Sequence, residues 1–122
     1  MERTEFVSAL ETVACQGAIK GVVSSLVQPA GRRPNPELLK LSEWFRALAA
    51  EDKQAVNRVI EMTASQALYN VLLALDGLVA IESAEEKGVL ELIYRKGEEV
   101  IRLNNPDEEA LSSLVKELNK GS

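Results

Sequence analysis

One apolar segment, residues 66–81 (QALYNVLLALDGLVAI), constrains the fold of this chain more than any other feature. Only three strongly polar side chains interrupt it, those of Gln66, Asn70 and Asp76. A helix that is apolar on nearly all sides must be covered by neighbouring elements if the protein is to stay in solution. The sequence therefore predicts a central core helix, with Asp76 and Gly77 either at its end or as an interruption within it.

Size and composition predict a single domain over residues 1–122. A chain of 122 residues has room for one hydrophobic core. Its 46% hydrophobic and 27% charged residues are ordinary for a soluble protein, whereas aromatic residues make up only 4%. The core must therefore consist mainly of leucine, valine, isoleucine and alanine, as is common in helical domains.

The charge of the chain is unevenly distributed. Residues 1–50 carry a net charge of +1, and residues 51–122 carry −6. An acidic second half repels phosphate groups, so neither nucleic acid nor an anionic membrane surface is an expected partner. The N-terminal sequence MERTEF has no signal-peptide pattern, which favours a cytoplasmic location.

The chain lacks residues that several kinds of catalytic and metal-binding sites require. The chain has no histidine and one cysteine, Cys15. This composition removes the usual general base, the commonest zinc ligand and any intramolecular disulfide. No catalytic residue, metal site or cofactor is therefore predicted. We expect Cys15 itself to be a buried small apolar side chain.

The apolar periodicity of residues 4–27 predicts a first helix that contains two glycines, Gly17 and Gly21. Each glycine costs about 1 kcal/mol relative to alanine inside a helix, so a compensating contact is expected. Together with Ala14 and Ala18 they form a row of small residues that lets another backbone approach closely. That backbone is either the central helix of the same chain, which we favour, or a second copy of this helix.

Two further helices are predicted after the first, one before the acidic half and one within it. The QPAGRRPNP segment at 28–36 is a loop, and Asn35 followed by Pro36 is typical of a helix start. The second helix reaches about Leu48, with Trp44 beside its apolar row as a core-edge residue or an exposed anchor for a partner. The central helix begins near residue 50. It either stops at Asp76 or, as we favour, continues to about Glu82.

The segment at 88–104 favours a β-hairpin over a helix. Alternating and β-branched residues flank Arg95, Lys96, Gly97 and Glu98, which suit a hairpin turn. A helix remains the alternative. A last helix is predicted over residues 106–119, because Asn105 and Pro106 repeat the start signal seen at Asn35. The predicted fold is mainly α, an α+β domain of about four helices around a central apolar helix, with one hairpin at about 89–103.

Five pieces of the sequence resemble a family of small uncharacterised bacterial helical proteins of the accessory genome, of the kind carried on mobile gene cassettes or beside toxin genes. These pieces are GRRPNPEL at 31–38, LSEWF at 41–45, EDKQAV at 51–56, LDGL at 75–78 and EEKGVLELIYRKGEEVIRLNNP at 85–106. None of them is a catalytic signature. The resemblance supports the hairpin and implies an accessory protein in a bacterium.

Asp76 is the first candidate for a ligand-binding residue, because a carboxylate within apolar surroundings is costly without a partner. It could pair with Arg32 or Arg33, lie solvated at the helix end, or act as an acid of raised pKa in a pocket. Asn70 lies four residues after Gln66 on one helical face. The two could line a polar pocket, although we favour hydrogen bonds to another helix as their role. The candidate ligand-binding set is therefore Asp76, Asn70, Arg32 and Arg33.

We expect two acidic clusters to be solvent-exposed charged surface and not metal sites. Glu82, Glu85 and Glu86 form one, and residues 107–109 form the other. Neither has the spacing of a calcium loop. The stretch from Gly31 to Arg33 likewise lacks the glycine pattern of a phosphate loop.

Two hypotheses about function follow. The first is a non-catalytic protein-interaction module, an accessory factor of the immunity or antitoxin kind, which forms a homodimer and binds a basic protein partner. Its interface candidates are Gly17, Gly21 and Trp44, since tryptophan is enriched at interface hot spots. The alternative is a small-ligand-binding protein or minor enzyme with a pocket near Asp76.

Overall fold

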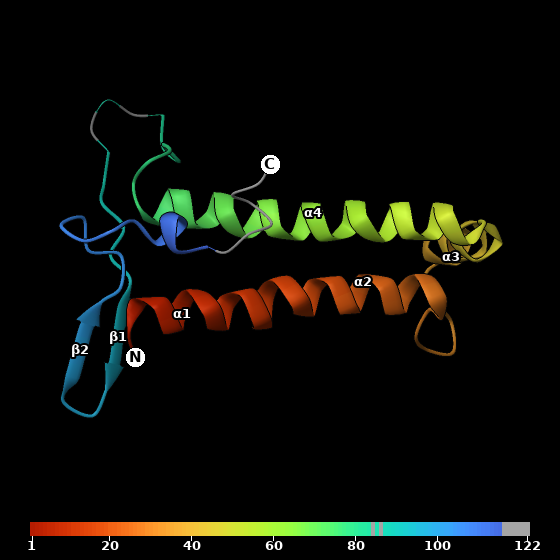
Figure 1. Ribbon diagram of the computed structural model, residues 1–122, viewed down its shortest axis with the longest axis horizontal. Helices are drawn as coiled ribbons and strands as arrows, with labels where there is room; N and C mark the ends of the chain where they lie inside the picture. The colour runs from red at the N-terminus through yellow and green to blue at the C-terminus, as the bar shows by residue number, and fades with distance from the viewer. Residues whose placement is uncertain (84, 86, 116–122) are drawn as a thin grey trace.

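The computed structural model of the chain describes residues 1–83, 85 and 87–115. Two long helical elements lie side by side and run in opposite directions (Figure 1). The first is a continuous helix formed by α1 (Arg3–Leu10), the π-helical segment η1 (Glu11–Gln16) and α2 (Gly17–Val27). We call it helix 1. The second is α4 (Ala50–Leu75), and α3 (Pro36–Ala47) joins the two at one end.

The opposite end of the helical pair carries the β-structure. Strands β1 (Ile93–Lys96) and β2 (Glu99–Arg102) form an antiparallel hairpin in which Ile93 is opposite Arg102. The hairpin projects beside the N-terminus (Figure 1), and the Met1 ammonium lies 2.6 Å from Glu99 Oε1. After β2 the chain returns to α4 and forms η2, a 3-10 helix at Leu111–Leu114.

Local sequence signals account for the helix boundaries. Asn35 Oδ1 accepts hydrogen bonds from the Glu37 and Leu38 N–H groups, at 2.8 and 3.4 Å, and Pro36 is the first residue of α3. At the C-terminal end of α4, Gly77 has φ of 76°. Its N–H donates to Ala74 O, and the N–H of Leu78 donates to Leu73 O. This pair of bonds is a Schellman motif, which ends the helix.

The core lies where helix 1, α4 and η2 meet. Leu72 is fully buried there, and Cys15 Sγ lies 3.4 Å from Ser65 Oγ across the helical pair. The buried cluster consists of Val7, Cys15, Leu68, Leu72, Leu111 and Val115. A second contact joins α3 to the end of α2, where Ser42 Oγ donates to Leu26 O at 2.7 Å beside buried Phe45.

The mainly helical fold with one antiparallel hairpin is confirmed, and its turn falls at Gly97 and Glu98 as predicted. The number of helices is slightly wrong, since the described residues form three helices. The preferred extension of the central helix to Glu82 is also wrong, because the Schellman motif at Gly77 ends it at Leu75.

The predicted helix over 106–119 is wrong within its described part. Asn105 Oδ1 accepts from the Asp107 N–H at 3.0 Å, and the Glu108 N–H donates to Asn105 O. These bonds close a turn, and only a short 3-10 helix follows it. Residues 116–119 of the prediction lie outside the described residues.

The preferred packing of the small residues against α4 is wrong as well. A Cβ built on Gly17 or on Gly21 would meet no atom of residues 1–83, 85 and 87–115 within 4 Å, and Ala14 and Ala18 are exposed. The cover expected for α4 is incomplete too, since Val59, Met62 and Val71 on this helix are exposed.

Candidate functional site

Two polar side chains, those of Asp76 and Asn104, bind several segments together at the end of α4. Asp76 follows the last turn of α4, and each of its carboxylate oxygens accepts a backbone hydrogen bond. Oδ1 accepts from the Leu111 N–H at 2.8 Å and Oδ2 from the Ser112 N–H at 2.9 Å. The carboxylate thus supplies the partners that the first N–H groups of η2 need. The Asp76 carboxylate therefore has a structural role, and its two backbone partners offset the cost of placing it near apolar side chains.

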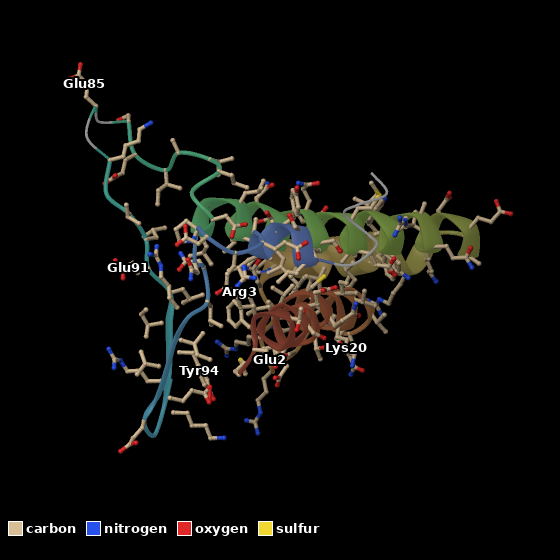
Figure 2. All side chains as sticks on the ribbon, turned by 60° about the vertical axis from the view of Figure 1, so that its left-hand side comes forward. Glu2, Arg3, Lys20, Glu85, Glu91 and Tyr94 are labelled. Atoms are coloured by element: carbon tan, nitrogen blue, oxygen red, sulfur yellow. The ribbon has the colours of Figure 1, made fainter. Side chains whose placement is uncertain are left out.

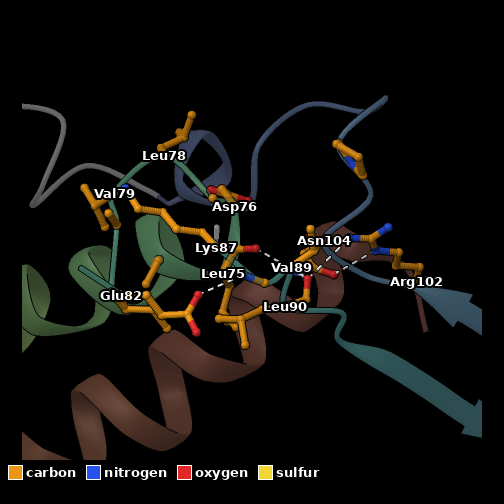
Figure 3. Close-up of a pocket in the computed structure, with 16 residues that line it drawn as sticks. Leu75, Asp76, Leu78, Val79, Glu82, Lys87, Val89, Leu90, Arg102 and Asn104 are labelled. Carbon is orange, nitrogen blue, oxygen red and sulfur yellow. Dashed lines mark hydrogen bonds between the residues drawn. The ribbon is translucent and has the colours of Figure 1, made fainter. Parts of the chain in front are cut away.

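Asn104 lies beside this contact and is 4% exposed. Its amide nitrogen donates to Leu75 O at 2.7 Å and to Leu90 O at 2.8 Å, and its Oδ1 accepts from the Leu92 N–H at 2.9 Å. Arg102 Nε adds a 3.3 Å bond to the same oxygen. One amide therefore joins α4, the segment before β1 and the segment after β2, as the dashed lines of Figure 3 show.

A pocket of about 820 Å³ opens beside these two residues (Figure 3). Five exposed apolar side chains from the connection between α4 and β1 line it, and we call them the apolar loop: Leu78, Val79, Ile81, Val89 and Leu90. Glu82 holds the two arms of this connection together, because its Oε2 accepts from the Gly88 N–H at 2.8 Å. The charged side chains of the lining are two acidic ones, Asp76 and Glu82, and two basic ones, Lys87 and Arg102.

The residues proposed from the sequence to bind a ligand together are not brought together. Arg32 and Arg33 are exposed in the connection between α2 and α3, at the end of the molecule opposite to Asp76 (Figure 1). Within the described part of the chain, Asp76 forms no ion pair with either arginine. Asn70 is exposed and accepts a 2.9 Å bond from Gln66 Nε2, and it does not line the pocket.

The interface candidates all lie on the surface. Gly17 and Gly21 are exposed on helix 1, and Trp44 is 52% exposed on α3. Cys15 is buried, as expected. In the described ranges no three side chains of the metal-binding types lie close enough to hold an ion.

Sequence reasoning missed two residues that hold this end of the molecule together, Asn104 and Arg3. Arg3 Nε donates to Leu103 O at 2.9 Å, its Nη2 donates to Glu109 O, and Glu108 lies 3.5 Å away. Figure 2 shows Arg3 at this junction, far from Glu85 at the outer tip of the loop. Both residues act on segments distant in sequence, so no local pattern marks them.

Helix 1 has an unusual combination of length and exposure. Among the described residues, the helix Arg3–Val27 is long and apolar enough to cross a membrane, with a mean hydropathy of 1.3. Only 11% of that apolar window is buried within the protein. A core helix of a soluble protein also has this length and composition but is mostly buried. The low burial shows that most of this apolar window faces away from the protein.

Comparisons of the chain with protein-family models, with curated proteins and with solved structures found no significant match.

Proposed function

We propose that this chain is a non-catalytic protein-interaction module, an accessory factor of the immunity or antitoxin kind. The observation that carries this proposal is the apolar loop, whose five side chains are all exposed at one end of the molecule. Exposed apolar side chains that gather in one place are typical of protein–protein contact sites.

The charges around the apolar loop support a basic partner. Glu82, Glu85 and Glu91 are exposed on the same connection, where Lys87 is the opposing charge. An apolar centre with an acidic rim fits a partner whose own apolar patch has lysine or arginine around it. The rim would speed association and select the partner, and the apolar loop would supply the affinity.

The polar groups of the pocket favour this function over the binding of a small ligand. Both oxygens of Asp76 and both polar atoms of Asn104 already have partners within the protein. A ligand would have to break these bonds to use them, and replacement of a buried hydrogen bond gains little. The apolar loop keeps its full contact area free.

The test is affinity capture from cells that naturally produce the chain, with the Leu78→Ser/Ile81→Ser double variant beside the unchanged protein. We expect the unchanged chain to retain one basic protein. The amount of that protein retained should fall at least tenfold with the double variant. Added salt should weaken its retention because the rim acts through exposed charges. The matched control is Val13→Ser, an equally exposed apolar residue on helix 1, which should retain the partner. Equal retention by all three proteins would contradict the proposal.

A further inference from the structure

We propose that helix 1 pairs antiparallel with helix 1 of a second copy of this chain, around a two-fold axis that passes between Gly17 and Ala18. In this proposal the chain associates with itself, in addition to the basic partner proposed above. It uses a surface separate from the apolar loop, so either proposal can fail without the other.

The surface of this pairing is the exposed face of helix 1 formed by Ala14, Gly17, Ala18 and Gly21, which we call the small-residue face. Among the described residues, nothing lies within 4 Å of a Cβ built at either glycine. Val13 and Val22, at the two ends of this face, are 75% and 46% exposed. Two glycines within a helix cost stability, and no packing contact from the described part of the same chain offsets that cost. A second backbone at close range would use the space that they leave.

The order of side-chain sizes along this face suits a second copy in particular. A two-fold axis across antiparallel helices places residues opposite each other whose positions mirror about the midpoint. Ala14 is then opposite Gly21, and Gly17 is opposite Ala18, so each contact joins two of the smallest side chains. One Val13 and one Val22, from different copies, lie at the same level at each end of the contact. A foreign partner would not require this mirrored order.

Charge decides between antiparallel and parallel pairing. Arg32 and Arg33 are exposed just beyond the C-terminal end of helix 1, while Glu2 and Glu5 are exposed at its N-terminal end. Antiparallel pairing brings the arginines of one copy to the acidic end of the other. Parallel pairing would place the two acidic ends side by side, where like charges repel. In this pairing Arg32 and Arg33 attract the acidic end of the second copy, whereas within the described part of one chain they form no ion pair with Asp76.

The surface area of the chain leaves ample room for such a contact. The accessible surface is 8804 Å² for a mass of 13.3 kDa. A folded monomer of this mass exposes about 6,450 Å², so the chain has roughly 2,350 Å² of additional surface. Its elongated shape accounts for a part of this excess. A standard interface takes about 800 Å² from each partner, so the excess can hold both the dimer contact and the apolar loop.

The first test is sedimentation equilibrium of the full chain and of Gly17→Leu. We expect the unchanged chain to be a dimer at micromolar concentration and the variant to dissociate at least 100-fold more readily. The new side chain meets nothing within its own protein, so the variant should fold normally by circular dichroism. The control is Gln16→Leu, which adds a leucine on another side of the helix and should leave the dimer intact. A monomeric unchanged chain, or a Gly17→Leu dimer of equal affinity, overturns the proposal.

Cysteine cross-linking tests the direction of the pairing. In a Cys15→Ser background, a mixture of Ala14→Cys and Gly21→Cys chains should cross-link under mild oxidation. Ala14→Cys alone should not, because the two copies of position 14 lie about 10 Å apart along the axis. Self-cross-linking of Ala14→Cys would overturn the antiparallel arrangement. Binding of helix 1 to neutral phospholipid vesicles in place of a dimer would overturn the self-association.

Discussion

The side chain of Asn104 joins several segments at this end of the molecule without carrying a charge. Its two donated and two accepted hydrogen bonds reach α4 and both sides of the hairpin. Such a residue cannot be found from local sequence, since Leu75 lies 29 positions away. The pattern around it instead drew attention to Asn105 and Pro106, which do start a turn but not a helix.

Replacement of Asn104 by alanine should lower the free energy of unfolding by about 2–3 kcal/mol, because it leaves buried carbonyl and N–H groups without partners. Urea unfolding followed by circular dichroism measures this loss. Asn70→Ala is the matched control, since the exposed Asn70 has a bond only to Gln66 and should cost less than about 0.5 kcal/mol. Equal stability of the two variants would show that the network around Asn104 contributes nothing.

Asp76 acts in the same region through its charge and its two oxygens. Asp76→Ala should destabilise the protein by about 1–2 kcal/mol, as is typical for the loss of a cap, and Asp76→Asn should cost less because one acceptor remains. Hydrogen exchange at the Leu111 and Ser112 amides should become faster in the same order. Asp107→Ala, at an exposed position close in sequence, should leave both amides protected. Unchanged protection in Asp76→Ala would contradict the capping role.

At the scale of elements, the sequence correctly predicted the features that depend on neighbouring residues. Asn35 and Pro36 start α3, and Gly97 forms the hairpin turn, because each acts on backbone groups within a few positions. The end of α4 was harder to predict. Leu78 and Ile81 continue the apolar spacing, but both are exposed, so that spacing belongs to exposed surface and not to a further helical turn. Apolar periodicity alone does not distinguish a further helical turn from exposed apolar surface.

The hairpin turn offers a test of this local control. Gly97 has φ of 62°, a left-handed conformation that costs side chains with a Cβ about 1–2 kcal/mol. Gly97→Val should therefore loosen the pairing of β1 and β2, seen as faster hydrogen exchange at the strand amides by NMR. Gly97→Asn should preserve protection, since asparagine tolerates this conformation. If valine and asparagine behave alike, the turn does not hold the hairpin in register.

At the scale of the whole molecule, the described residues cover the apolar face of α4 only in part. The part of α4 that helix 1 and η2 cover is buried, as at Leu68 and Leu72, whereas Val59 and Val71 are exposed. The sequence could show that cover was needed, but not whether it comes from the same chain. That choice depends on packing between distant segments, which also left the small-residue face open.

If a second copy covers the small-residue face of helix 1, the stability of the fold must depend on protein concentration. Unfolding of a dimer releases two chains, so mass action favours the folded state as concentration rises. Over an approximately hundredfold range, we expect the melting temperature to rise by about 5 °C, given the unfolding enthalpy usual for a chain of this length. Differential scanning calorimetry at several concentrations measures the shift. Gly17→Leu should melt at one temperature throughout the range, because its folded monomer gains nothing from a second copy. An unchanged chain that also melts at a constant temperature would mean that the monomer is the stable unit and that its exposed apolar surface serves only foreign partners.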